Sequence, residues 1–269
     1  MLSQWFADEF ALGIAQAAVA AVILLLFAFV LTRIKINLFK EILIAMVRSL
    51  AQIVAVGSVL IVILNGPILV GGLVLLGMMI SAAVTAARRV KGIPGAQRAA
   101  FLSIVLGSGT VVGLMTFLGV IEWKLESIIP VGSMMINGGM NSCALALERF
   151  RAEIQSHTDQ IEARLALGAE PKAATDGYVR AAFQASMIPR IDSMRSLGIV
   201  WIPGLMSGMI LAGSSPLYAG IYQFVVMAML FISSGVSALI SVTLVQNGIF
   251  SEADQLILRS NNEIQVRAR

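Results

Sequence analysis

The sequence predicts an all-α, polytopic integral membrane protein. Of its 269 residues, 58% are hydrophobic and only 13% are charged, whereas soluble domains are about 45–50% apolar and about 25% charged. A helix needs about 20 apolar residues to cross a bilayer, and the chain contains seven apolar runs of roughly that length. Composition and run length together exclude an ordinary soluble enzyme and a disordered chain.

The seven predicted membrane helices are spread along the whole chain. The first begins after Asp8 and Glu9 instead of Lys or Arg, and its apolar stretch is longer than that of a signal peptide, so we expect it to remain as a true span. The sixth is short and is interrupted by Pro203 and Gly204. The predicted helices cover residues 10–31, 42–64, 68–87, 99–120, 127–147, 197–212 and 219–246.

The placement of basic residues predicts the orientation. Lys and Arg follow the first and third runs, lie between the fifth and sixth, and end the chain, whereas the opposite loops contain one basic residue, Lys124. By the positive-inside rule, the N-terminus is outside and the C-terminus is cytoplasmic. The formal net charge of +4 is therefore a consequence of topology, and we expect no binding to nucleic acid.

The largest segment outside the apolar runs is 148–195. It contains seven acidic and seven basic residues, and Ile154, Ile161 and Leu165 fall on one helical face. Gly168 is a candidate C′ glycine, and Pro171 is a candidate first residue of the next helix. We predict a cytoplasmic helix-turn-helix over 148–195, within a single transmembrane domain that covers residues 1–269.

Residues that would supply energy for transport are missing. None of the five lysines follows a glycine, so the chain has no Walker phosphate loop. The apolar runs contain almost no acidic residues that could relay protons. Cys143 and His157 have no metal-binding companions nearby, so any metal site is unknown. Energy for transport must come from a partner, and the chain itself is predicted not to be an enzyme.

A motif in the cytoplasmic segment points to that partner. Glu162 and Ala163 are followed by Gly168 and Pro171, a pattern that resembles the EAA loop of ABC-transporter permeases, which docks into an ATPase subunit. Arg164 stands where that motif has its second alanine, and an ordinary helix-turn-helix is the alternative. The predicted ATPase-coupling residues are Glu162, Ala163, Gly168, Ala169 and Pro171.

A longer pattern resembles the FetB family of bacterial membrane proteins over nearly all of the chain except the first span and the tail. One departure is Asn137-Gly138-Gly139, where the family tends to have Gly-Asn. The pattern consists of residues 166–174, Arg180, Ile188-Pro189, Asp192-Ser193, Gly198, 203–208, Ala212-Gly213, Pro216 and Tyr222-Gln223, with Arg48, Gln52, Gly57, Pro130, Met134, Asn141 and Glu148-Arg149.

The resemblance implies the permease subunit of an ABC-type exporter in the inner (plasma) membrane, linked to iron export. Two copies would form the pathway within the membrane lipid, and separate FetA-type ATPase subunits would bind ATP and Mg, leaving this chain without a cofactor. Plant relatives are associated with aluminium tolerance and with transport of sugar nucleotides. A permease for such an organic solute, and an ATPase-independent carrier or scaffold, are therefore the alternatives.

Methionine and asparagine residues in the fifth and sixth runs are candidates for the translocation path. Thioether sulfur suits soft metal ions and amide oxygen suits harder ones. The alternative is that methionine fills irregular gaps between helices and that asparagine joins helices by hydrogen bonds. The predicted path residues are Met134, Met135, Asn137, Met140, Asn141, Met206 and Met209.

A second group is predicted to support structure or gating. Pro203 beside Gly204 frees a backbone carbonyl and favours a hinge, and Gly204 with Gly208 forms a small-residue face for helix packing. Arg48 lies four residues from Gln52 and could pair with Glu148 at the inner mouth or extend to the interface. The predicted residues are Arg48, Gln52, Glu148, Pro203, Gly204 and Gly208.

The pairing of Arg48 with Glu148 predicts charge-reversal rescue. Arg48→Glu should abolish solute transport because it places two carboxylates together, and adding Glu148→Arg in the same chain should restore part of it. Transport into membrane vesicles measures both. A double variant as inactive as the single one removes the support for the pairing.

Overall fold

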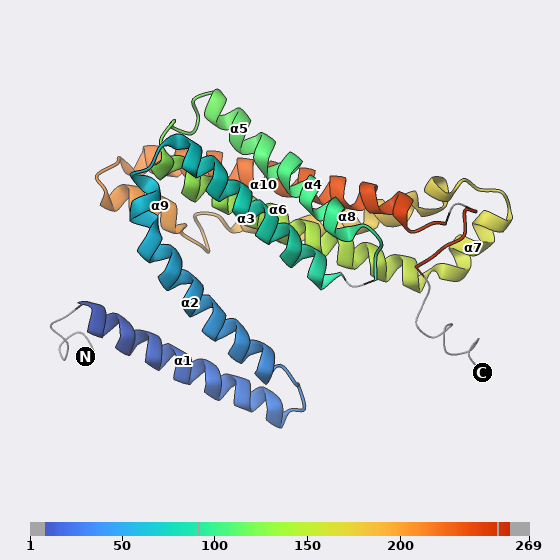
Figure 1. Cartoon of the computed structure of the whole chain (residues 1–269), viewed down its shortest axis with the longest axis horizontal. Helices are drawn as coiled ribbons and strands as arrows, with labels where there is room; N and C mark the ends of the chain where they lie inside the picture. The colour runs from blue at the N-terminus through green and yellow to red at the C-terminus, as the bar shows by residue number, and fades with distance from the viewer. Residues whose placement is uncertain (1–8, 91, 252, 259–269) are drawn as a thin grey trace. The chain divides into compact units, whose positions relative to one another are not determined.

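The computed structural model describes residues 9–90, 92–251 and 253–258, and the regular secondary structure within them is helical. These residues divide into two compact units, Met1–Asn65 and Gly66–Arg269. The elements labelled in Figure 1 are α1 (Glu9–Arg33), α2 (Phe39–Leu64), α3 (Ile68–Arg89), α4 (Ala96–Ile104), the π-helix η2 (Val105–Gly109), α5 (Thr110–Phe117), α6 (Leu125–Ser156), α7 (Thr158–Ala166), α8 (Pro171–Ser196), α9 (Gly204–Leu211) and α10 (Pro216–Gly248).

The first unit is a pair of apolar helices, α1 and α2, that pack against each other. Most of their described side chains are exposed, including Phe27, Ile53 and Val54. Arg33 ends α1 and its guanidinium lies 4.9 Å from the centroid of the Phe29 ring. Exposed apolar surface of this extent is expected of helices whose solvent is lipid.

The second unit is built around α6, α8 and α10, with α3 and α4 packed beside them. Its largest cluster of buried side chains is rich in alanine, which allows helix axes to approach closely. Phe150 and Leu147 of α6 are fully buried in this cluster. Along the unit, α7 lies at one end and α9 at the other (Figure 1).

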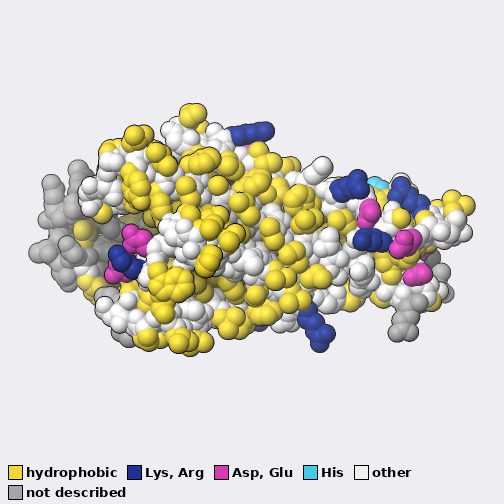
Figure 2. All heavy atoms as spheres, turned by 90° about the horizontal axis from the view of Figure 1, so that it is seen from above, with side chains coloured by type: hydrophobic (Ala, Val, Ile, Leu, Met, Phe, Trp, Pro, Cys, Tyr) yellow, Lys and Arg dark blue, Asp and Glu magenta, His cyan; other side chains and the backbone are white. Residues whose placement is uncertain are grey.

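The surface of the second unit changes character along its length. Figure 2 shows hydrophobic side chains over the middle of the visible face and Lys, Arg, Asp and Glu gathered toward the end that carries α7. This separation is expected when the apolar part faces lipid and the α7 end faces water.

The predicted fourth membrane helix contains a π-helical turn. Helical structure runs from Ala96 to Phe117, but residues Val105–Gly109 have i→i+5 geometry. Gly107 in this turn contacts α10 closely: a Cβ placed there would lie 2.8 Å from the backbone nitrogen of Ser237. Ser108 donates a hydrogen bond to the carbonyl of Met135 in α6 (3.0 Å). The widened turn thus joins α6 and α10.

Five described segments are long and apolar enough to cross a membrane: Phe10–Arg33, Phe39–Leu60, Ile68–Arg89, Ala96–Phe117 and Pro216–Gly248. They correspond to the first four predicted helices and the seventh. The predicted fifth helix lies within α6, whose amide, serine and glycine residues lower its hydropathy. An all-α membrane protein is therefore confirmed, whereas seven spans and the orientation of the termini stay predictions.

The predicted sixth helix, over residues 197–212, is not continuous. Helix α8 ends at Ser196, and the next helix, α9, has only 8 residues, Gly204–Leu211, or about 12 Å of the roughly 30 Å that a bilayer core requires. Gly198 has φ of 78°, a conformation that few other residues adopt, and Pro203 has no N–H for a helical bond. These residues interrupt the helical structure between α8 and α9.

The close contact at Gly107 predicts that an alanine lowers the stability more at this position than at Gly113. Gly107→Ala should destabilise the second unit by about 1–3 kcal/mol, because the new methyl group would overlap the α10 backbone. Gly113→Ala is the matched control, since no atom lies within 4 Å of a Cβ there. Thermal unfolding in detergent compares the two, and equal midpoints would contradict the close approach.

Candidate membrane cavity and cytoplasmic turn

The break between α8 and α9 borders a cavity of about 200 Å³. Its walls come from α6, α8, α9, α10 and the connecting residues, so the cavity is enclosed by segments far apart in the sequence. The lining residues are Met134, Asn137, Arg190, Trp201, Pro203, Gly204, Leu205, Gln223, Val226, Met227 and Leu230.

Close packing of α6 with its neighbours positions the cavity. A Cβ on Gly138 would lie 2.6 Å from the Cδ1 atom of Leu230 in α10, so a larger residue at this position would require the Leu230 side chain to move. On the same turn, the Gly138 carbonyl accepts a hydrogen bond from Nη2 of Arg190 (3.4 Å). The second half of α8 therefore lies beside the middle of the predicted fifth helix. This part of α8 belongs to the 148–195 segment that the sequence predicts to be cytoplasmic.

Three polar side chains face the cavity. Arg190 is half-buried, and Gln223 is 4% exposed with its Oε1 atom lacking a hydrogen-bond partner. Asn137 accepts a hydrogen bond at Oδ1 from Nδ2 of Asn141 (3.2 Å), which confirms that these two asparagines share one helix face. Together they give a small polar site with apolar walls and one positive charge.

The predicted path residues separate into three positions. Met134 and Asn137 line the cavity. Asn141 donates a hydrogen bond to Asn137 behind this lining. Met135 is fully buried, and its carbonyl accepts hydrogen bonds from Ser108 and Ser233 (3.0 and 3.2 Å). The remaining three lie outside the cavity lining: Met140 packs against the main core, while Met206 and Met209 are half-buried on α9.

The predicted gating residues are also divided. Pro203 and Gly204 form part of the cavity wall, and a Cβ on Gly208 would meet no atom within 4 Å. The side chains of Arg48, Gln52 and Glu148 are exposed. Arg48 and Gln52 belong to the first unit and Glu148 to the second, so their pairing stays a prediction.

Besides four apolar residues of α9 and α10, the sequence predictions did not include Arg190, Trp201 and Gln223 among the residues of this cavity. Arg190 was assigned to the charge-balanced cytoplasmic segment, although it stands between apolar residues in Met187-Ile188-Pro189-Arg190-Ile191. An arginine within such a run is the signal that could have identified it.

The predicted coupling turn has a well-defined geometry. Gly168 adopts φ of 86° and donates to the Leu165 carbonyl (2.9 Å), while Ala169 donates to the Arg164 carbonyl (3.0 Å). These two bonds form a Schellman cap, and Pro171 is the first residue of α8. The prediction that Gly168 ends one helix and Pro171 begins the next is confirmed.

The tip of the turn combines rigidity with exposed apolar surface. Leu167 is 88% exposed, and Ala163 is exposed on the same helix, while Glu162 and Ala169 are half-buried. Arg164 donates through Nη1 to the Ala174 carbonyl (3.2 Å) and joins α7 to α8. Single exposed apolar side chains are common on protein surfaces, so the feature specific to this turn is the backbone that its Schellman cap fixes.

A family model for the uncharacterised protein family UPF0014 matches residues 14–250. The chain belongs to this family. Among curated UPF0014 relatives, the chain is 32% identical to the probable iron export permease protein FetB of Escherichia coli over 225 residues, covering 83% of the chain and 87% of the relative. No solved structure matches the chain.

Two plant proteins show similar agreement with this UPF0014 chain. The protein ALUMINUM SENSITIVE 3 of Arabidopsis thaliana is 32% identical over 248 residues, covering 91% of the chain and 90% of the relative. The UPF0014 membrane protein STAR2 of Oryza sativa subsp. japonica is 32% identical over 253 residues, covering 93% and 88%. The predicted resemblance to FetB and to plant aluminium-tolerance proteins is thereby confirmed.

Metal-binding clusters are not found in the described part of the UPF0014 chain, where no three His, Cys, Asp or Glu residues gather. The His157 ring stacks on Tyr178 with centroids 4.9 Å apart, and its Nδ1 atom lies 3.6 Å from a carboxylate oxygen of Glu153. Cys143 is buried in the main core.

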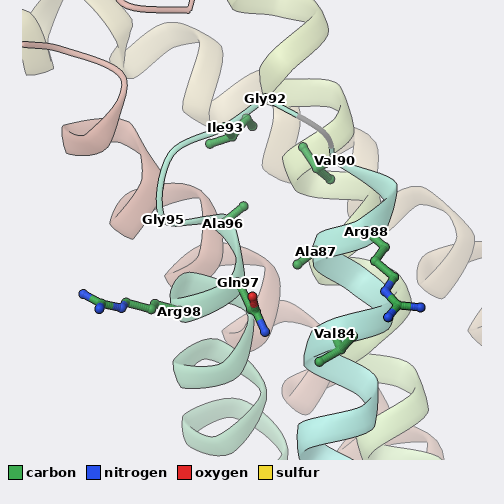
Figure 3. Close-up of a pocket in the computed structure, with 10 residues that line it drawn as sticks. All are labelled: Val84, Ala87, Arg88, Val90, Gly92, Ile93, Gly95, Ala96, Gln97 and Arg98. Atoms are coloured by element: carbon green, nitrogen blue, oxygen red, sulfur yellow. The ribbon is translucent and has the colours of Figure 1, made fainter.

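A larger surface pocket of about 800 Å³ lies where α3 turns into α4. Its lining includes Arg88 and Arg98, but Figure 3 shows these side chains pointing away from each other. Two arginines that diverge do not form a common anion site, so the smaller cavity beside α9 is the better candidate for solute binding.

The turn is connected to α10 through one buried amide. Gln246, which is 2% exposed, donates from Nε2 to the Lys172 carbonyl (3.1 Å), to Oγ1 of Thr175 (3.1 Å) and to Oδ1 of Asp176 (2.9 Å). This cluster attaches the end of α10 to the first turns of α8, directly after the coupling turn.

Replacing this amide by a carboxylate should be costly. Gln246→Glu removes the donor and faces Asp176 with a like charge, so we expect a loss of about 1–3 kcal/mol. Asn247→Asp makes the same chemical change at an exposed neighbour and should leave stability nearly unchanged. Thermal unfolding in detergent measures both, and equal midpoints would show that the cluster contributes nothing.

Proposed function

We propose that the chain is the permease subunit of an ABC-type exporter and that its 162–171 turn docks into a separate ATPase subunit. The observation that carries this proposal is the exposed, Schellman-capped turn with Leu167 at its tip, joined to the membrane helices by Arg164 and Gln246. A rigid turn can transmit a displacement, whereas a flexible loop would absorb it.

In this proposal the chain crosses the membrane seven times, with the N-terminus outside and the C-terminus cytoplasmic. The sixth crossing consists of the second half of α8, the 197–203 break and α9. Asn137 lies about 18 Å along α6 from Leu125, which places the cavity near the middle of the bilayer core. Broken helices beside a cavity at this depth are typical of transport proteins.

Helix α8 is the proposed mechanical link. It begins at Pro171, next to the turn, and carries Arg190 about 28 Å further along its axis. Pro189 lies inside the helix immediately before Arg190 and removes one helical hydrogen bond, which weakens the helix there. Movement of the turn on closure of the ATPase dimer would therefore be transmitted along α8 to the cavity.

The proposed cargo is iron or a related metal, and the proposed assembly is a permease homodimer with two FetA-type ATPase subunits in the inner membrane. ATP and Mg would be bound by those subunits. The metal cargo is supported by the similarity to FetB of Escherichia coli, a probable iron export permease.

Docking at the turn is tested by a glycine pair. Gly168→Glu should abolish co-purification of the ATPase subunit, because it places a bulky charged side chain on the turn at a position with positive φ. Gly177→Glu, on an exposed face of α8 with no atom within 4 Å of a Cβ, is the control. An intact complex with Gly168→Glu would contradict the proposed docking site.

Cargo is tested with the purified complex. We expect the ATPase activity to be stimulated by iron or by another transition metal, and less by nucleotide sugars. Stimulation by a nucleotide sugar alone would replace the metal proposal with an organic solute.

A further inference from the structure

Arg190 carries an unbalanced positive charge into the cavity. Its one described hydrogen bond is to the neutral Gly138 carbonyl, and none of the ion pairs among the described residues includes it. The acidic residue two positions along, Asp192, lies 3.7 Å from Arg195 instead. The cavity lining contains no carboxylate. A guanidinium in apolar surroundings without a counter-ion favours an incoming anion.

A second observation, independent of charge, also points to a ligand. The Gln223 side chain lines the cavity and is 96% removed from solvent, since its exposed fraction is 4%, yet its Oε1 atom has no donor. Buried amide oxygens are almost always hydrogen-bonded. That oxygen has no accessible surface in this conformation, so a hydroxyl group of a solute in the cavity would reach it only after the Gln223 side chain rotates.

A bare metal cation fits this lining poorly. Met134, Asn137 and Gln223 are neutral ligands, and no carboxylate is present to offset the repulsion from Arg190. The volume of about 200 Å³ is below the roughly 300–1,000 Å³ of pockets for drug-sized molecules. The cavity therefore suits a small acid or a single phosphate group better than a whole nucleotide.

We propose that the cavity binds a small hydroxylated oxyanion, a carboxylate or phosphate, with Arg190 as its charged donor and the Gln223 amide, after rotation of its side chain, as acceptor for its hydroxyl group. This inference rests on the proposed permease function and specifies the chemistry of the solute that occupies the cavity. The two sources of the shared chemistry, a hydroxycarboxylic acid and a phosphate, are separated by the probes used.

Trp201 provides a direct reporter because it lines the cavity. The full-length chain with Trp5→Phe and Trp123→Phe retains it as the one remaining tryptophan. In lipid nanodiscs at constant ionic strength, sodium citrate or sodium phosphate should change its fluorescence saturably, while Mn²⁺ alone should not. Citrate without phosphate identifies a carboxylate site, and phosphate without citrate identifies a phosphate site.

Variants at one helix assign the response to the cavity. Arg190→Gln should weaken oxyanion binding by about tenfold or more, as expected for loss of a charge-assisted hydrogen bond. Arg190→Lys keeps the charge without the planar fork and should lie between. Arg195→Gln is the control, because that arginine is exposed and faces Asp192. Thermal unfolding of each variant shows whether Arg190→Gln is folded. If Arg190→Gln does not fold, the oxyanion affinity of Arg190→Lys is the test.

Three outcomes would overturn the inference: saturable binding of Mn²⁺ without binding of either oxyanion, an oxyanion response that is unchanged by both Arg190 variants, and no response to citrate or phosphate at millimolar concentration. None of these depends on an ATPase partner. Oxyanion binding by a chain that fails to associate with an ATPase would instead contradict the proposed function and leave the site intact.

Discussion

The close approach of α6, α10 and the π-helical turn is the constraint on which the rest of the second unit depends. Three glycines, Gly107, Gly138 and Gly139, lie so close to serine or leucine side chains that a methyl group would force a neighbour to move, and at Gly107 the neighbouring atoms include the α10 backbone. The hydroxyl of Ser233 donates to Ser108 (2.9 Å) and links α10 to the turn. In lipid, where burial of apolar surface drives little helix association, short contacts and hydrogen bonds of this kind hold a bundle together.

The same constraint creates the cavity. Gly138 allows Leu230 of α10 to lie close to α6. The carbonyl group of Gly138 accepts a hydrogen bond from Arg190 of α8. Helix α8 then ends at Ser196, and the short α9 leaves space beside Gln223. A continuous sixth helix would fill this space, so the interruption between α8 and α9 and the cavity are one structural feature.

The two ends of α8 lie at the 162–171 turn and at the cavity. At its beginning, Gln246 and Arg164 attach α8 to α10 and α7 through four hydrogen bonds. Near its end, Pro189 and Arg190 lie at the membrane site. Conformational coupling in proteins travels through rigid elements with two arrangements, and both α8 and α10 extend from the region of the turn to the cavity.

Local sequence patterns determined the class of the protein and several of its features. Apolar composition predicted an all-α membrane protein, the Gly168 and Pro171 spacing predicted the capped turn, and the four-residue spacing of Asn137 and Asn141 predicted their shared face. These depend on neighbouring residues and on periodicity. Only the tertiary structure decided that residues 197–203 break the sixth helix and that Arg190, Asn137 and Gln223 meet, because these side chains come from three helices far apart in the sequence. The charge of Arg190 is visible in the sequence, but the lack of a counter-ion for it among the described residues is a property of packing.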